Sequence, residues 1–368
     1  MPLVRSQVLK MIKKDQRRLR VGVLGCGQIA QAAHFESCAK ARNVDLYAIC
    51  DVAADLVQRM AEIHRPARSY SDYATMLADS ELEAVIIATA DAFHVPASIA
   101  ALESGKHVLC EKPLGVAVEE VERVRDLVEA SGLVLQVGHM KRFDSGLQAA
   151  KQFIQTDLGE MLAFKAWYCD STHRYVVTEA VQPLIVRSAQ SRKPSVDPKA
   201  DLSRYDMLAH GSHILDTARY LAGALVEVEA RVRERFGSRC WFVDVAFASG
   251  ALGHLDLTIP VHMDWHEGFH IYGQNGCLIA KAYNPWLFKT TDVEIFSERD
   301  LATTRVLGAD GHFFRRQLES FAAAILERTP VEGADVYDGV AAVRGMVAIA
   351  QSARSGRPVR LDGVSGPL

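Results

Sequence analysis

Two histidines in one short segment have the chemistry and the spacing expected of proton-transferring groups. The segment, residues 206–216, reads DMLAHGSHILD, and its apolar residues recur at helical spacing. His210 and His213 are three residues apart, so a helix would place them on nearly the same face. Histidine often acts as a general acid or base because its pKa lies near neutral pH. The segment therefore predicts a helix that offers at least one histidine for catalysis.

A lysine in the sequence EKP, residues 111–113, is a further candidate for chemistry. It follows a run of apolar residues that predicts a buried strand. Ligands of open α/β sheets bind at the carboxyl ends of the strands, so Lys112 would lie at the edge of that crevice. Its positive charge could stabilise an alkoxide while hydride leaves. The alternative is an ordinary solvated lysine in a loop.

Two different kinds of sheet are needed to position these residues. Between residues 19 and 139, short runs rich in Val, Ile and Leu alternate with helical patterns, which predicts a doubly wound parallel sheet with helices on both faces. After residue 160 the chain is rich in strands, with hairpin turns expected at 249–250 and 274–276. The expected fold class is therefore α/β followed by α+β, the second sheet being mostly antiparallel.

The sequence GCGQIA, residues 25–30, follows the first predicted strand and opens the first predicted helix. Gly25 permits a tight turn, Gly27 lets the backbone approach a pyrophosphate, and Ala30 allows close packing of the helix on the strand. Asp51 ends the next strand, where its carboxylate would bind ribose hydroxyls and repel a 2′-phosphate. This favours NAD over NADP. The alternative is a glycine turn that binds nothing.

The remaining expected cofactor contacts follow the ends of the strands. Thr89 ends one predicted strand and should lie beside the cofactor. His94 is expected either to lie there or to have a local structural role. The full set of expected cofactor-binding residues is Gly25, Gly27, Gln28, Ile29, Asp51, Thr89, His94, Glu111 and Lys112.

Composition excludes several other classes of function. The 368 residues carry a net charge of −3, so no overall basic field indicates nucleic acid binding. No apolar run is long enough for a membrane helix, and the basic first 18 residues lack the apolar region of a signal peptide. Seven widely spaced cysteines without a CxxC motif argue against disulfides and zinc, and fit a reducing cytoplasm. Histidines at 262, 266 and 270 lie in a strand-like context without metal-ligand geometry, so no metal is expected.

The motifs GCGQIA, TADAFH (residues 89–94), EKP and the HxxD helix together resemble the Gfo/Idh/MocA oxidoreductases, such as glucose–fructose oxidoreductase and the inositol dehydrogenases. The resemblance runs from about residue 19 to the end. It implies a Rossmann domain and an open-faced sheet domain that often forms a dimer or tetramer. It also implies a tightly held nicotinamide cofactor and sugar-like substrates oxidised at a secondary alcohol. In this family pattern Lys112 is the active-site lysine and His213 the general acid/base.

The chain departs from that pattern at one position. Many members carry an aspartate four residues before the histidine, where this sequence has Ala209. Asp206 would lie about 10.5 Å from His213 along a helix axis, too far for contact. The unreacting nitrogen of His213 is therefore expected to be supported by Asp216, by His210 or by neither.

Other residues are candidates for the substrate side. Lys141 is the basic candidate after the last parallel strand, whereas Arg142 and Asp144 are expected to form a structural ion pair. Trp265 could stack on a sugar ring or pack in the core. The basic stretch 170–204, which includes His173 and Arg174, could cover the substrate, reach a partner subunit or be solvated surface. The expected substrate-binding residues are Lys141, His210, Asp216 and Trp265.

These observations lead to one expected organisation and function. The expected units are an N-terminal extension (1–18), an NAD-binding Rossmann domain (19–140), a substrate and oligomerisation domain (141–335) and a C-terminal helix that packs back on the Rossmann domain (336–368). The expected activity is NAD-dependent oxidation of a secondary hydroxyl of a sugar, inositol or glycoside, with a 3-keto product compatible. The expected assembly is a homodimer or homotetramer through the second sheet. The alternatives are a redox-neutral glycoside-cleaving or epimerising enzyme that uses NAD catalytically, and an inactive NAD-binding regulator.

Overall fold

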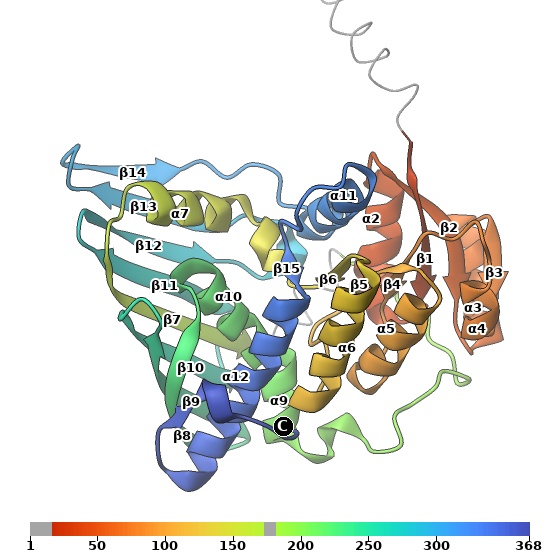
Figure 1. Ribbon diagram of the computed structural model, residues 1–368. Helices are drawn as coiled ribbons and strands as arrows, with labels where there is room; N and C mark the ends of the chain where they lie inside the picture. Colours follow the sequence, from red (N-terminus) through yellow and green to blue (C-terminus); the bar gives the residue numbers. More distant parts are fainter. Residues whose placement is uncertain (1–16, 173–181) are drawn as a thin grey trace, which may run out of the picture.

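The computed structural model describes residues 17–172 and 182–368. Most of the expected N-terminal extension, together with His173 and Arg174, lies outside the described residues. Two sheets organise the rest of the chain, and each has its own set of helices (Figure 1). Lys112 lies in the half that contains the first sheet, whereas His210 and His213 lie in the half that contains the second sheet.

The first sheet has the strand order of a dinucleotide-binding domain. Its strands lie in the order β15-β6-β5-β4-β1-β2-β3, which gives the 3-2-1-4-5-6 pattern followed by an added edge strand. All pairs are parallel except β15 with β6. The doubly wound parallel sheet expected from the sequence is confirmed. The strands are β1 (Leu19–Leu24), β2 (Val44–Cys50), β3 (Arg68–Tyr70), β4 (Ala84–Ile87), β5 (His107–Cys110), β6 (Leu135–Val137) and β15 (Ala334–Asp335).

Helices cover both faces of this sheet, which explains why its central strands are apolar without alternation. All four residues of β4 are buried. The helix after β1 includes a π-helical turn, η1 (Ala30–His34), before α2 (Phe35–Lys40), and α6 ends at Gly132 in a left-handed conformation with φ +66°. The other elements on this sheet are α3 (Ala54–His64), α4 (Tyr73–Leu77), η2 (Asp91–Phe93), α5 (His94–Glu103) and α6 (Val118–Ser131).

The second sheet has nine strands and is mostly antiparallel. Their order is β14-β13-β12-β11-β7-β10-β9-β8-β16, and only β7 and β10 pair in parallel. The hairpins expected at 249–250 and 274–276 join β9 to β10 and β11 to β12. The strands are β7 (Met161–Ser171), β8 (Leu225–Arg235), β9 (Ser238–Phe247), β10 (Leu252–Val261), β11 (His266–Gly273), β12 (Gly276–Ala282), β13 (Asp292–Ser297), β14 (Ala302–Val306) and β16 (Val359–Arg360).

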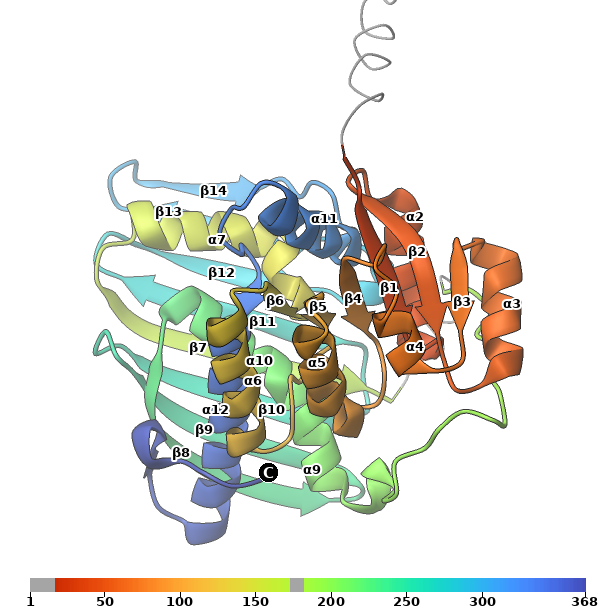
Figure 2. The same ribbon diagram turned by 45° about the vertical axis from the view of Figure 1, so that its right-hand side comes forward.

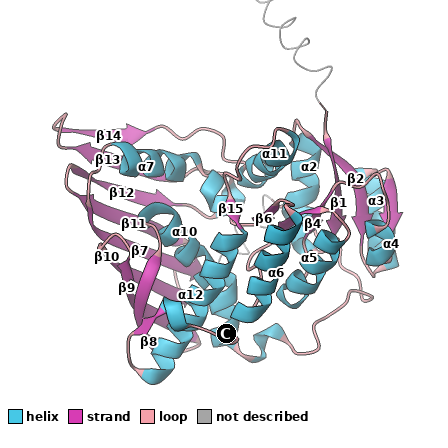
Figure 3. Cartoon of the chain, viewed as in Figure 1, coloured by secondary structure: helices cyan, strands magenta, loops and turns pink. Residues whose placement is uncertain are grey.

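Helices pack on one face of the second sheet and leave the other face open (Figure 3). The covered face is apolar, with Phe164, Phe269 and Leu278 fully buried, whereas Phe242 and Ile279 are about half exposed on the opposite face. The helical elements that follow β6 along the chain are η3 (Met140–Phe143), α7 (Ser145–Thr156), η4 (Pro198–Ala200), α9 (Leu202–Asp206), η5 (Met207–Gly211), α10 (Ser212–Ala222), η6 (Pro285–Leu287), α11 (Phe313–Leu326), α12 (Val336–Ser355) and η7 (Leu361–Gly363). Of these, α11 packs on η1, α2 and β2 of the first sheet.

The long helix α12 joins the two halves. It contacts α6 on the first sheet and β8 on the second, and both views show it beside α6 (Figure 2). The helix begins with a capping box between Asp335 and Asp338. Among the described helices, α12 included, none is long and apolar enough to cross a membrane.

The segment after residue 181 reaches back to the first domain of its own chain. The amide of Gln31 donates to the Val186 carbonyl and accepts from the Val186 N–H, both at 2.9 Å. The hydroxyl of Ser188 donates to the carboxylate of Asp55 at 2.7 Å. These bonds place residues 186–192 beside the glycine-rich turn rather than in open solvent.

Candidate active site

The glycine-rich turn after β1 leaves open space where a dinucleotide phosphate would lie. Gly25 has a φ of +95°, and a Cβ there would lie 2.5 Å from the carbonyl oxygen of Ala88, so only glycine fits. A Cβ on Gly27 would meet no described protein atom within 4 Å. The backbone at Gly27 is therefore accessible to a ligand at the start of the helix.

Asp51 is held beside this turn by two backbone hydrogen bonds. The N–H of Cys26 donates to Oδ2 of Asp51 at 2.8 Å, and the N–H of Ala53 donates to Oδ1 at 2.9 Å. A carboxylate has about four lone-pair sites, so two directions remain for ribose hydroxyls. The residues present therefore fit a dinucleotide.

A cleft of about 860 Å³ runs along the carboxyl ends of the parallel strands. It is of the size that accommodates a cofactor. The segment after β7 contributes to its wall through Ser191 and Arg192, and the Arg192 guanidinium lies 4.6 Å from the centre of the Phe93 ring. The predicted residues that line the cleft are Gly25, Gly27, Gln28, Ile29, Asp51 and Thr89.

His94 does not line this cleft, in contrast to its place among the expected cofactor contacts. Its side chain is 1% exposed, and its two ring nitrogens lie 2.7 Å from the Pro113 carbonyl and 3.1 Å from the Thr89 carbonyl. Both ring nitrogens are thus occupied by the backbone. His94 ties the Thr89 loop to the Lys112–Pro113 loop.

A second cavity of about 200 Å³ adjoins the cofactor cleft and contains the reaction motifs. Ile29, Tyr205 and Trp286 line both spaces, so the second cavity begins where the first ends. Residues from the two halves of the chain meet in its wall. They include Glu111, Lys112, Tyr168, His210, His213 and Trp265.

Lys112 reaches across the cavity to the helix that carries the histidines. Its Nζ donates to the carbonyl of Ala209 at 2.9 Å. Ala209 belongs to the π-helical turn η5, so the position at which an aspartate was expected supplies a backbone oxygen to the lysine. The Lys112–Pro113 peptide bond is cis.

Glu111 lies beneath this loop and supports it. Its Oε1 lies 2.9 Å from Nε2 of His34, and its Oε2 accepts the N–H of Lys112 at 3.2 Å. Burial raises the pKa of Glu111, but His34 and Lys112 outweigh this effect, so the pKa is lowered and the carboxylate stays charged. The cavity therefore has a fixed anion next to its lysine.

His213 faces the cavity in a positively charged environment. Burial lowers its pKa well below the usual value, and Lys112, Lys141, His139 and His210 lower it further. The ring lies parallel to that of Tyr168, with centroids 6.0 Å apart. At neutral pH His213 is therefore an uncharged imidazole that can accept a proton.

Asp216 does not contact His213, although the i+3 spacing allowed it. Arg142 donates to the Asp216 carboxylate from Nε at 3.1 Å and from Nη2 at 2.6 Å. The described residues contain no hydrogen bond between Asp216 and His213. Asp216 is 2% exposed and absent from the cavity wall, so the expectation that it binds substrate is not supported by its position.

His139 lies between Asp216 and His213. Its Nδ1 is 3.7 Å from Oδ2 of Asp216, and its ring meets that of His213 edge-on with centroids 6.5 Å apart. Burial lowers the pKa of His139, and Arg142 and Lys112 add to the shift, so this histidine is also neutral. The carboxylate of Asp216 thus reaches His213 only through a neutral ring.

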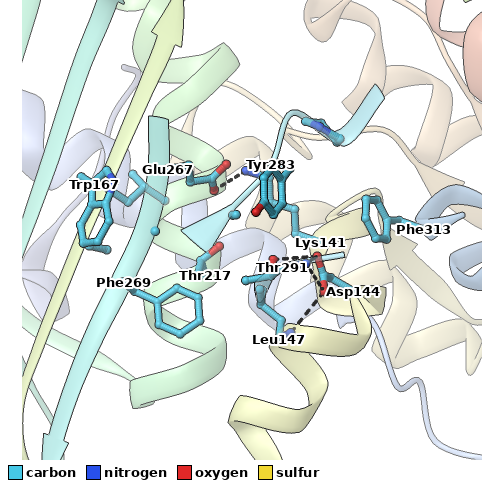
Figure 4. A pocket seen from close by; sticks show the side chains of 15 residues that line it. Lys141, Asp144, Leu147, Trp167, Thr217, Glu267, Phe269, Tyr283, Thr291 and Phe313 are labelled. Atoms are coloured by element: carbon cyan, nitrogen blue, oxygen red, sulfur yellow. Dashed lines mark hydrogen bonds and ion pairs between the residues drawn. The ribbon is translucent and has the colours of Figure 1, made fainter. Parts of the chain in front are cut away.

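The expected ion pair between Arg142 and Asp144 is wrong. Arg142 pairs with Asp216 and also donates to Asp338 at 2.7 Å. Asp144 instead caps α7 by accepting the N–H of Gly146 at 2.7 Å, and it accepts the hydroxyl of Thr291 at 2.8 Å (Figure 4). The arginine therefore joins η3, α10 and α12 in a buried network.

Lys141 lies behind the reaction cavity and not in its wall. Its Nζ pairs with Oε1 of Glu267 at 2.5 Å in a small pocket beside Tyr283 and Phe313 (Figure 4). The same ammonium lies 4.4 Å from the centre of the Tyr168 ring. Because its charge is paired and buried, Lys141 is not placed to bind an anionic substrate directly.

Trp265 lines the cavity next to the candidate catalytic residues. Its Nε1 donates to Oε2 of Glu267 at 3.2 Å, and its ring meets Tyr168 edge-on with centroids 5.2 Å apart. The indole is therefore fixed in orientation at the cavity surface.

The candidate active site described above uses neither a cysteine nucleophile nor a metal ion. All seven cysteines are free thiols. Burial raises the pKa of Cys50 to about 12, with Asp51 adding to the shift, so this thiol is not a nucleophile. The described part of the chain holds no cluster of three or more His, Cys, Asp or Glu side chains that could bind a metal ion.

Sequence comparison agrees with this geometry. Residues 19–139 match the sequence model of an oxidoreductase family with an NAD-binding Rossmann fold, and residues 207–361 match the C-terminal α/β domain of the same family. The chain belongs to the Gfo/Idh/MocA oxidoreductase family. It is thus an oxidoreductase with an NAD-binding Rossmann domain, as the motifs predicted.

Two relatives of this chain are about a quarter identical to it in sequence. The uncharacterized oxidoreductase YrbE of Bacillus subtilis is 26% identical over 94% of this chain and 97% of its own length. The myo-inositol 2-dehydrogenase of Thermotoga maritima is 27% identical over 71% of this chain and 75% of its own length. A levoglucosan dehydrogenase solved with NADH and levoglucosan superposes with a TM-score of 0.77 at 22% identity, covering 94% of this chain and 100% of its own.

Three residues at or beside the cavities were not singled out from the sequence. Tyr168 lies in a strand that was expected only as scaffold, whereas Asp170, which contacts His210, and Arg192 lie in the stretch 170–204, whose role was left open. His139, near His213, directly follows the last parallel strand. The rule that singled out Lys112, a polar residue after the carboxyl end of a parallel strand, also applies to His139.

Proposed function

We propose that the protein oxidises a secondary hydroxyl of a sugar, inositol or glycoside with NAD⁺. The observation that carries the proposal is the cavity of about 200 Å³ in which Lys112 and His213 meet beside the cofactor cleft. Inositol dehydrogenases among the relatives and a levoglucosan dehydrogenase among the similar structures support a sugar-like substrate. The proposed product is the corresponding ketone, which is a 3-keto sugar where carbon 3 is oxidised.

The chain's own residues supply binding and proton transfer. NAD⁺, when bound, accepts the hydride from the substrate carbon. His213 is neutral and takes the proton of the substrate hydroxyl, and Lys112 stabilises the negative charge that develops on that oxygen. Glu111 holds the lysine loop, and Trp265 offers a flat apolar surface to the sugar ring.

The test of this proposal is a substrate panel read in two ways. Purified protein and NAD⁺ are incubated with sugars, inositols, uronates and glycosides while NADH absorbance and product mass are followed. Accumulation of NADH together with a product two mass units lighter than its substrate supports the oxidation. Product formation without NADH would support the redox-neutral alternative, and tight NAD binding without any turnover would support a regulatory protein.

Asp51 is proposed to select NAD over NADP. Asp51→Asn keeps a hydrogen-bond acceptor for the turn but removes the charge that would repel a 2′-phosphate. We expect the ratio of kcat/KM for NAD⁺ to that for NADP⁺ to fall by about 10-fold or more, since hydrogen bonds to charged groups contribute about 1.5–3 kcal/mol. Asp45→Asn, at the other end of β2, is the matched control. An unchanged ratio in Asp51→Asn would contradict the proposed role.

The open face of the second sheet is proposed to bind a second copy of the chain. Phe242, Tyr272 and Ile279 are exposed there to 50%, 36% and 48%. Large apolar side chains on an uncovered sheet face mark a surface at which proteins associate. Ile279→Glu is therefore expected to shift the protein from a dimer or tetramer to a monomer in light scattering, whereas Leu301→Glu, in the β13–β14 turn, should not. A monomeric unmodified protein would refute this assembly.

A further inference from the structure

The residues that surround His210 form a chain of polar contacts that starts at the cavity. Tyr168 and Asp170 are two apart on β7, so their side chains lie on the same face of the strand. The hydroxyl of Tyr168 lies 3.4 Å from Nδ1 of His210, and Oδ2 of Asp170 lies 3.6 Å from Nε2 of the same ring. One imidazole thus lies between a tyrosine that lines the cavity and a carboxylate.

All three side chains are buried. Tyr168 is 3% exposed, Asp170 is 5% exposed and His210 is 7% exposed. A buried carboxylate needs a cation or several hydrogen bonds to remain charged. Asp170 lies 3.6 Å from Nε2 of His210, so its carboxylate would stabilise a protonated His210.

His213 has the opposite environment. Lys112, Lys141, His139 and His210 all disfavour a positive charge on its ring, and no described carboxylate pairs with it. A proton accepted from substrate is therefore unstable on His213 and has to move on before the next turnover. His210, one helical turn earlier, also lines the cavity.

We propose that Asp170 and His210 act as the proton relay of this active site and replace the aspartate that is absent at position 209. This inference rests on the proposed oxidation. In that reaction the substrate O–H bond breaks and its proton goes to His213, while the C–H bond breaks and its electron pair leaves with hydrogen as hydride to NAD⁺. The proton then passes from His213 to the hydroxyl of Tyr168, which lines the same cavity, and this hydroxyl gives its own proton to Nδ1 of His210, 3.4 Å away. Asp170 stabilises the imidazolium, and solvent finally receives the proton. Tyr168 positions the His210 ring.

The test combines Asp170→Asn and His210→Gln with added buffer. Each variant is expected to lower kcat for oxidation by about 10-fold to 100-fold at pH 7 with little change in KM. High concentrations of imidazole should restore most of kcat, because a small base in the cavity can carry the proton instead. The loss of kcat in each variant, relative to the unmodified protein, should also become smaller as the pH rises. Among the described residues, the titratable groups around His210 and His213 are Glu111, Lys112, His139, Lys141, Tyr168, Asp170 and Tyr205. Each single variant leaves the other groups in place.

The double variant and a matched control separate the relay from a structural effect. Asp170→Asn combined with His210→Gln should be no slower than the slower single variant, because both residues act in one path. Glu62→Gln removes the carboxylate from the exposed pair with Arg59 on α3 (3.1 Å) and should change nothing. If Asp170→Asn does not fold, His210→Gln and Tyr168→Phe carry the same test.

The proton relay and the proposed oxidation would be contradicted by different results. Full activity of the Asp170 and His210 variants, or a loss that imidazole does not restore, would overturn the relay and leave the proposed oxidation intact. Absence of NADH and of product with the unmodified protein would overturn the proposed oxidation itself.

Discussion

His213→Gln is expected to lower kcat for oxidation by about 10²–10⁴-fold, since that is the usual contribution of a general base. Glutamine keeps a hydrogen-bonding side chain of similar reach but cannot accept the proton of the substrate hydroxyl. The Kd for NADH should remain unchanged, because His213 does not line the cofactor cleft. Rates are followed by NADH absorbance. Binding is followed by fluorescence of Trp286, which lines both cavities.

The pH profile of the unmodified protein provides an independent check on His213. A base works only in its deprotonated form, and burial together with four neighbouring groups lowers the pKa of His213. Activity should therefore persist as the pH falls through 6.5, the usual pKa of histidine, and decline only at lower pH. Glu62→Gln, in the exposed pair with Arg59 on α3, is the control. Near-normal turnover of His213→Gln would refute the assignment.

The fold of the first domain could be predicted from the sequence because the motifs that indicate it are local. The glycines of GCGQIA, the strand that ends at Asp51 and the EKP loop each depend on neighbours within a few residues, and the strand order follows from right-handed connections. The helix α7 was not anticipated, although Asp144 gives a capping signal before its apolar pattern. The open-faced second sheet was anticipated only through hairpin turns and family resemblance.

The ion-pair partners of the buried charged residues in the second half could not be predicted from the spacing of residues in the sequence. Arg142 finds Asp216 and Asp338, which are 74 and 196 residues away, and Lys141 finds Glu267 at a separation of 126. Their neighbours in sequence, such as Asp144, suggested local pairs that the fold does not make. The π-helical turn at 207–211 also alters the helical register that was used to judge which carboxylate could reach His213.

Lys112→Met should slow oxidation by about 10²–10³-fold, the cost of removing one group that stabilises an oxyanion. A second effect is expected on the pH profile. Lys112 lies at the cavity and contributes to the low pKa of His213, so its removal should raise that pKa. The acid limb of kcat/KM should consequently move to higher pH, and the variant should lose relatively more activity at pH 6 than at pH 8.

Lys112→Arg distinguishes these two effects because it keeps the charge and changes the geometry. The guanidinium is planar and bulkier, so it would not keep the geometry of the contact that Nζ makes to the Ala209 carbonyl at 2.9 Å. This variant should therefore be slow but should keep the acid limb of the unmodified protein. If Lys112→Met and Lys112→Arg were equally slow and both kept that limb, the lysine would act by position alone. The neutral state of His213 would then have to come from burial and from the other groups around it.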